Sequence, residues 1–235
     1  AEADLDSPDD TLQNGTVVIR SHGVGKPIYD KLKEKNISYV DVTCPFVLKI
    51  HRIVEKESLA GNHVIIIGDK DHPEVQGICG WCQGPYTVIK NQEEAEAFLL
   101  PEGKKISIVS QTTFNYNKFK DLVEILCKKR YDNNVLNILN ILNTICNATE
   151  ERQREAKNIA GEVDTMLVVG GRHSSNTQKL FEICKKECGN TYYIQTPVDL
   201  DSEMFQCSSC VGITAGASTP KKIIEEVQEH VRVKF

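Results

Sequence analysis

The sequence lacks several features that would place it in a familiar class. No apolar run is long enough to cross a lipid bilayer, so no membrane-spanning helix is expected. The first residues contain neither a basic nor an apolar stretch of the signal-peptide kind. Glycine-rich loops of the Walker or Rossmann type are absent, which argues against a nucleotide ligand. The net charge of −5 argues against broad nucleic-acid binding.

Cysteine, by contrast, is abundant. Nine cysteines occur without an export signal, and this predicts reduced thiols or metal ligands in a cytoplasmic protein. The odd number leaves at least one thiol outside any disulfide framework. The chain has 235 residues, of which 40% are hydrophobic and 26% charged. This composition is typical of a soluble globular protein, and the length is sufficient for about two compact domains.

Short β-rich runs alternate with helical patterns along the chain. Strands are expected at residues 16–20, 37–42, 63–67, 86–89, 106–109, 165–169, 192–195 and 211–214. Helices are expected at residues 27–35, 46–60, 92–99, 117–130, 147–160, 175–186 and 220–231. Repeated strand–helix units predict an α/β protein whose parallel sheets are covered on both faces. In such sheets ligands bind beyond the carboxyl ends of the strands.

Two cysteine-bearing junctions suggest boundaries within the chain. The expected parts are residues 1–44, 45–142 and 143–235. Residues 137–142 repeat the triplet Asn-Ile-Leu, and we interpret them as a short insertion before the third part.

Cys44 and Cys146 occupy matching positions, each at a strand end before a helix. A free cysteine is often only a small buried apolar residue. The shared position nevertheless favours metal ligation, because a helix N-terminus favours the thiolate, the form that binds metal. Two cysteines cannot complete the coordination of an iron–sulfur cluster, so a third thiol is expected. The spacing alone does not decide between a cluster and zinc.

Two C-x-x-C pairs support an alternative interpretation. They are Cys79–Cys82 and Cys207–Cys210, and together they would form a zinc site. Their separation along the chain is greater than in most zinc ribbons. A dithiol formed by Cys79 and Cys82 is a further alternative.

Two histidines and one acid lie at strand ends beside glycine or proline. His22 and His72 are candidate donors to phosphate oxygens, although either alone is more simply a loop histidine bonded to backbone. Glu74 follows Pro73 in an expected loop, and a carboxyl group there can relay protons beside a metal site. Taken alone, Glu74 is as well explained by an exposed salt bridge.

Three further strand–helix junctions carry hydroxyl and amide side chains. They are Ser174-Ser175-Asn176, Thr112-Thr113 and the segment 214–220, which contains Ser218. Serine and asparagine are common N-caps, so helix capping explains them by itself. The exposed N–H groups of a helix start also bind anions, and both roles can hold together. Three such junctions favour a diphosphate ligand.

These motifs together resemble the LytB/IspH family of 4-hydroxy-3-methylbut-2-enyl diphosphate reductases. The segments that carry the resemblance are Arg20-Ser21-His22-Gly23-Val24, Asp41-Val42-Thr43-Cys44-Pro45, His72-Pro73-Glu74-Val75-Gln76-Gly77, Ser110-Gln111-Thr112-Thr113, Cys146-Asn147-Ala148-Thr149, Ser174-Ser175-Asn176 and Thr214-Ala215-Gly216-Ala217-Ser218. The seven motifs occur in the family order along most of the chain.

The resemblance implies three small parallel-sheet α/β lobes around a central [4Fe–4S] cluster, with the first lobe incomplete here. It implies the reductive dehydroxylation of an allylic diphosphate to isopentenyl and dimethylallyl diphosphate in the non-mevalonate pathway. Electrons would come from ferredoxin or flavodoxin. The family's first cluster cysteine lies in a glycine-rich segment that has no counterpart here, so we expect an N-terminally truncated chain.

The resemblance also implies a role for each matching residue. Cys44 and Cys146 match cluster ligands, and Glu74 matches a proton-relay carboxylate with Thr112 beside it. The residues that match contacts to the substrate are His22, His72, Thr112, Ser174, Ser175, Asn176 and Ser218. The alternatives to an active reductase are a zinc- or dithiol-bearing binding domain and an inactive fragment that lacks one cluster ligand.

Overall fold

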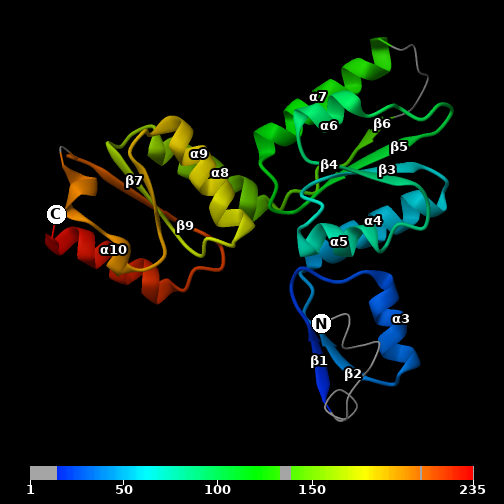
Figure 1. Ribbon diagram of the computed structural model, residues 1–235, viewed down its shortest axis with the longest axis horizontal. Coiled ribbons are helices and arrows are strands. Elements are labelled where there is room, and N and C mark those ends of the chain that lie inside the picture. Colours follow the sequence, from blue (N-terminus) through cyan, green and yellow to red (C-terminus); the bar gives the residue numbers. More distant parts are fainter. Residues whose placement is uncertain (1–14, 133–138, 207, 235) are drawn as a thin grey trace. The chain divides into compact units, whose positions relative to one another are not determined.

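The computed structural model describes residues 15–132, 139–206 and 208–234. These residues fall into two compact units, which can be followed by colour in Figure 1. Unit 1 contains the described residues as far as Thr112 together with those of Asn117–Ile145. Unit 2 contains Thr113–Tyr116 and the described residues from Cys146 onward.

Unit 1 begins with a small parallel sheet of two strands. Its elements are β1 (Thr16–Ile19), α3 (Lys26–Glu34) and β2 (Ser38–Asp41). Helix α3 covers one face of this sheet, where Ile19, Leu32 and Ile37 are buried. Val18 and Val40 are partners in the register and are 60% and 50% exposed.

The second sheet of unit 1 has four parallel strands in the order β4-β3-β5-β6. Its elements are α4 (Pro45–Leu59), β3 (His63–Ile67), α5 (Pro73–Cys79), β4 (Tyr86–Ile89), α6 (Gln92–Ala97), β5 (Ile106–Ser110), α7 (Tyr116–Asp132) and β6 (Leu139–Ile141). Figure 1 shows α4 and α5 on one face and α6 and α7 on the other. Because both faces are covered, β3 is apolar and buried from Val64 to Ile67, and β5 is buried throughout, including Ser107 and Ser110.

Unit 2 contains a three-stranded parallel sheet in the order β8-β7-β9. Its elements are α8 (Asn147–Ala160), β7 (Thr165–Val169), α9 (Ser175–Glu187), β8 (Thr191–Ile194), the 3-10 turns η1 (Pro197–Asp199) and η2 (Ser202–Phe205), β9 (Val211–Ala215) and α10 (Lys221–Lys234). Helices α8 and α9 cover one face, where Met166 and Val168 are buried. Helix α10 covers the other, beside Leu167 and Val169.

The predicted α/β class and the parallel sheets are confirmed. Strands β3, β4 and β7 and helix α8 have the predicted bounds. The expected loop after His72 is wrong, because residues from Pro73 form helix α5. Proline suits the first turn of a helix, and His72 accepts a hydrogen bond from the Glu74 N–H as an N-cap.

The interpretation of residues 137–142 as a short insertion stays a prediction, although part of this segment has regular structure. Leu139–Ile141 forms β6, an edge strand that pairs in parallel with β5. Residues 137 and 138 lie outside the described residues. The three-part division at residues 44 and 142 stays a prediction. No helix within the described ranges has the length and apolar character needed to span a membrane.

Candidate active site

The buried carboxyl group of Glu74 forms the centre of the candidate site in unit 1. Glu74 is the second residue of α5 and is 1% exposed. The Thr112 backbone N–H donates to Oε1 at 2.6 Å, and the Thr112 hydroxyl donates to Oε2 at 2.8 Å. Burial raises the pKa of Glu74, and the two Thr112 hydrogen bonds offset part of that rise. Such a carboxyl group can hold and pass a proton nearer to neutral pH than an exposed one.

The imidazoles of His22 and His72 lie beside each other at this end of the second sheet. Their ring centroids are 5.3 Å apart with an interplanar angle of 75°. His72 Nδ1 accepts the Glu74 N–H at 3.1 Å, so a neutral His72 ring carries its proton on Nε2. Burial lowers the pKa of His22, and the nearby Arg20 lowers it further. The pair offers ring N–H donors that can bind an anion.

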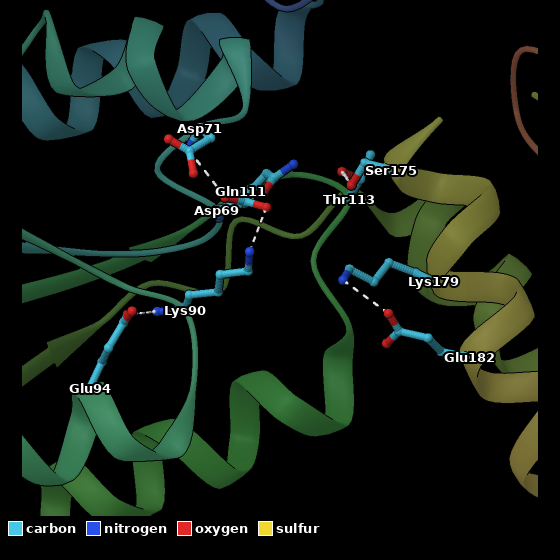
Figure 2. Close-up of polar contacts among 9 residues, drawn as sticks. All are labelled: Asp69, Asp71, Lys90, Glu94, Gln111, Thr113, Ser175, Lys179 and Glu182. Atoms are coloured by element: carbon cyan, nitrogen blue, oxygen red, sulfur yellow. Dashed lines mark hydrogen bonds and ion pairs between the residues drawn. The ribbon is translucent and has the colours of Figure 1, made fainter. Parts of the chain in front are cut away.

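Hydrogen bonds fix the loop that precedes His72, as Figure 2 shows. The Gln111 Oε1 accepts the Asp69 N–H at 3.3 Å, and the Asp69 carboxylate binds Lys90 Nζ at 2.8 Å. The Asp71 N–H donates to the same carboxylate at 3.2 Å. The loop therefore reaches α5 with little freedom, which holds His72 and Glu74 in place.

Cys44 is the N-cap residue of α4, and its side chain makes no capping hydrogen bond. The turn before it is held by Asp41, which accepts the Thr43 N–H at 2.9 Å and the Tyr29 hydroxyl at 2.9 Å. The Cys44 N–H donates to the Ser21 carbonyl at 3.0 Å. Cys44 is half-buried and forms no disulfide with any described cysteine.

Cys146 has the same local position at the start of α8. It is the N-cap residue, and its side chain makes no capping hydrogen bond. The preceding Thr144 hydroxyl donates to the Ser110 carbonyl at 2.6 Å and accepts the Ser110 N–H at 2.8 Å. Cys146 is half-buried and free of any disulfide to another described cysteine.

The start of α9 carries the polar residues of unit 2. Ser174 is the N-cap and accepts the Thr177 N–H at 3.4 Å, so the capping interpretation is confirmed. The Thr113 hydroxyl donates to Ser175 Oγ at 3.3 Å, as Figure 2 shows. Asn176 is 6% exposed, and neither polar atom of its amide has a partner among the described residues. A buried amide with unused donors and an acceptor at a helix start suits an anionic ligand.

Two glycines bring the ends of β7 and β9 close to this helix start. A Cβ on Gly216 would lie 2.1 Å from Thr177 Oγ1, and one on Gly170 would lie 2.7 Å from the same atom. Any side chain at either glycine would push α9 away from the strand ends. Ser218 lies in the exposed segment between β9 and α10.

The structure collects the predicted site residues into two groups. Unit 1 contains His22, Cys44, His72, Glu74 and Thr112, and unit 2 contains Cys146, Ser174, Ser175, Asn176 and Ser218. Sequence reasoning assigned no role to Gln111 or Asp69, which order the loop before His72. Gln111 lies in the family motif Ser110-Gln111-Thr112-Thr113, and its place there could have marked it as a site residue.

His51 on α4 was also missed. It is 1% exposed, and neither ring nitrogen has a hydrogen-bond partner in the described part of the chain. Burial lowers its pKa to about 4, against an opposing effect of Asp41. The ring is therefore neutral at ordinary pH.

The Cys79–Cys82 pair gains no support as a metal site. Burial raises the pKa of Cys79, and burial together with Cys79 raises the pKa of Cys82 to about 12. Both thiols pack against the apolar core and stay protonated at neutral pH. Cys207 lies outside the described residues.

The thiols of Cys44 and Cys146 have the donor chemistry of a thiolate-held iron–sulfur group. Both stand at helix starts and are free of capping hydrogen bonds that would occupy them. The described ranges contain no group of three or more Cys, His, Asp or Glu side chains placed to bind a metal. Each of the two residues therefore offers one thiol of the kind that ligates a cluster.

Comparison with known proteins identifies the family. A sequence model of the LytB protein family matches residues 2–232. A 4-hydroxy-3-methylbut-2-enyl diphosphate reductase from Caldanaerobacter subterraneus is 45% identical over 221 residues, which cover 94% of this chain and 74% of that protein. The reductase of the same name from Geobacter sulfurreducens is 44% identical over 94% of this chain and 76% of its own length.

Solved structures agree with the sequence relatives. The E-1-hydroxy-2-methyl-but-2-enyl-4-diphosphate reductase of Plasmodium falciparum has a TM-score of 0.86 at 27% identity, over 95% of this chain and 68% of that chain. A structure described as (E)-4-hydroxy-3-methyl-but-2-enyl diphosphate reductase, the terminal enzyme of the non-mevalonate pathway, has a TM-score of 0.63 at 38% identity, over 96% of this chain and 79% of that chain. From the motifs, the parallel sheets and these matches we conclude that the chain belongs to the LytB family.

Proposed function

We propose that this chain reduces 4-hydroxy-3-methylbut-2-enyl diphosphate to isopentenyl and dimethylallyl diphosphate, as the names of its relatives suggest. The observation that carries the proposal is the buried Glu74 carboxyl, which both Thr112 donors hold beside His72. The reaction removes the substrate hydroxyl as water and needs protons as well as electrons. A buried carboxyl with a raised pKa is a suitable proton source.

Glu74 and Thr112 would handle the proton. In the ionised state of Glu74 the Thr112 hydroxyl donates to Oε2. Once Glu74 is protonated, this hydrogen bond would reverse, so that Oε2–H donates to Thr112 Oγ1 and Thr112 passes its own proton to an acceptor beside it. The Thr112 N–H holds the other oxygen and fixes which oxygen faces the hydroxyl. We assign Glu74 as the acid that protonates the leaving hydroxyl, with Thr112 as the intermediate group.

We propose that neutral donors bind the diphosphate. In unit 1 these are the ring N–H groups of His22 and His72. In unit 2 they are Ser174, Ser175, Asn176 and Ser218, supported by the N–H groups at the start of α9. Donors of this kind suit an anion in a chain whose net charge is negative.

Cys44 and Cys146 would hold a [4Fe–4S] cluster together with a third ligand. When bound, this group would supply electrons singly and a Lewis-acidic iron for the substrate hydroxyl. We propose ferredoxin or flavodoxin as the electron donor and the cytoplasm as the location, in keeping with reduced thiols.

The test is anaerobic reconstitution with iron and sulfide, followed by a turnover assay with the allylic diphosphate. We expect broad visible absorption with bound iron and sulfide, both lost in Cys44→Ala and in Cys146→Ala. Cys127→Ala on α7 is the matched control and should keep the absorption. A colourless wild-type chain, or Cys44→Ala with an unchanged spectrum, would contradict the proposal and favour an inactive fragment or a thiol-bearing binding domain.

A further inference from the structure

The single tryptophan of the chain, Trp81, joins α5 to the loop that carries His22. Trp81 follows Gly80, the C-cap residue of α5. Its indole Nε1–H donates to the Val24 carbonyl at 2.9 Å. Val24 lies two residues after His22, so this hydrogen bond acts on the backbone of the His22 loop, residues 20–25.

Aromatic and cationic side chains from two helices surround the indole. His51 of α4 stacks on it at a centroid distance of 5.2 Å and an interplanar angle of 19°. Tyr29 of α3 packs against it at 5.7 Å, and Lys26 Nζ lies 6.0 Å from the ring centroid. Contacts on several sides restrict the indole to one orientation, which aims Nε1 at Val24.

The backbone of the His22 loop lies directly against α5 at the same place. A Cβ on Gly80 would lie 2.6 Å from the Gly25 Cα, and the Lys26 N–H donates to the Gly80 carbonyl at 3.3 Å. Gly23 has a φ of +69°, a conformation that favours glycine. Backbone contacts therefore hold the loop against α5, and the Trp81 hydrogen bond adds a side-chain contact to them.

Helix α5 connects this contact to the candidate site. His72 is its N-cap and Trp81 follows its C-cap, so the two residues mark opposite ends of one seven-residue helix. At the far end, the His22 and His72 rings meet at 5.3 Å. The separation of the two imidazoles therefore depends on where the His22 loop docks against α5.

We propose that Trp81 is a positioning residue that docks the His22 loop on α5 and so sets the spacing of His22 and His72 for one diphosphate group. The inference rests on the proposed function for the identity of the ligand. Trp81 itself contacts the loop backbone and acts through His22.

The test compares Trp81→Phe with the matched control Cys82→Ala. Phenylalanine keeps a ring for His51 to stack on and removes the Nε1–H donor, whereas Cys82→Ala alters the same turn without a contact to Val24. Binding of inorganic pyrophosphate is measured by calorimetry, and the unfolding midpoint checks that each variant is folded. We expect Trp81→Phe to bind roughly three- to tenfold more weakly and Cys82→Ala to bind as wild type.

A double-mutant cycle shows whether Trp81 acts through His22. In a His22→Ala background, Trp81→Phe should cause no further loss of pyrophosphate affinity. An additive loss in that background, or wild-type affinity in Trp81→Phe itself, would overturn the positioning role and leave the proposed function intact. Failure of the wild-type chain to bind pyrophosphate at all would overturn both.

Discussion

The buried polar groups of unit 1 include ionisable side chains, whereas those at the start of α9 in unit 2 do not. In unit 1 the pKa of the buried Glu74 is raised, and the pKa of the buried His51 is lowered to about 4. At the start of α9 in unit 2 the groups are hydroxyls and the buried amide of Asn176, which stay uncharged. The comparison therefore separates groups of unit 1 that can gain or lose a proton from groups at the start of α9 that keep the same charge at any ordinary pH.

The strongest way to break this comparison is Glu74→Gln. The amide keeps the shape of the carboxyl but cannot deliver a proton, so turnover should fall at least about a hundredfold while pyrophosphate still binds. Steady-state kinetics and calorimetry measure the two effects. Glu57→Gln is the control, because Glu57 is also a hydrogen-bonded carboxylate of unit 1. Full turnover with glutamine at position 74 would remove the proton-relay role.

His51→Phe should reduce the loss of folding stability that unit 1 shows as the pH falls. The folded-state pKa of His51, about 4, lies below its ordinary value of 6.5. The unfolded chain therefore takes up the proton first, so stability is present above pH 6.5 and is lost as the pH falls toward 4. The wild type should lose about 3 kcal/mol over that range through this residue.

Phenylalanine can keep the stacking on Trp81 and carries no titrating group. Denaturant unfolding at pH 7, 5.5 and 4 measures the difference in pH dependence. Equal pH slopes in both proteins would show that His51 is not buried as a neutral ring. Hydrogen exchange should place the acid-induced opening in unit 1 and not at α9.

Asn176→Leu tests the other side of the comparison. The variant removes a buried amide that has no partner among the described residues, so unfolding should become harder by about 1 kcal/mol or somewhat more. Pyrophosphate binding should weaken in the same protein. Ser174→Ala should instead lower stability by about 1 kcal/mol through loss of the N-cap. A destabilised Asn176→Leu would mean that the amide serves the fold.

Ion pairs at the partly exposed surface should show the smallest effects in either unit. Lys90→Met removes the Asp69 pair in unit 1, and Lys179→Met removes the Glu182 pair in unit 2, both drawn in Figure 2. Each should cost less than about 1 kcal/mol, because exposed pairs gain little over solvent. Thermal unfolding measures this. Only Lys90→Met should also weaken pyrophosphate binding slightly, because Asp69 helps order the loop before His72.

The sequence predicted well those elements whose local pattern of apolar residues is sufficient to define a strand or a helix. Strand β3 is a run of β-branched residues, and helix α8 follows a strand end and keeps buried residues on one face. Helix α5 was missed because it is short and contains Gly77, which lowers helix propensity. Strand β6 has three residues and is defined only by its pairing with β5.

The site residues also fall into a group that the sequence could identify and a group that it could not. The motif residues could be named from the sequence because the family pattern marks them, and their positions relative to the ligand remain predictions. Contacts between distant segments could not be named from the residues themselves, and only the pairing of Glu74 with Thr112 was expected, through the family resemblance. Trp81 meets Val24 across 57 residues, and Glu74 meets Thr112 across 38. Such contacts depend on how the strands are ordered in the sheet, which a single sequence does not specify.

The segment Thr113–Tyr116 belongs to unit 2, although the chain returns to unit 1 immediately after it. Gln153 on α8 binds this segment, since its amide donates to the Phe114 carbonyl at 3.1 Å and accepts the Tyr116 N–H at 3.1 Å. Phe114 itself is 4% exposed. A protein expressed from Cys146 onward would therefore lack the buried Phe114 side chain. It would also lack the Phe114 carbonyl and the Tyr116 N–H, the two groups to which the Gln153 amide bonds. Dissection of the protein into separately folding pieces will need this short segment grafted onto the C-terminal piece.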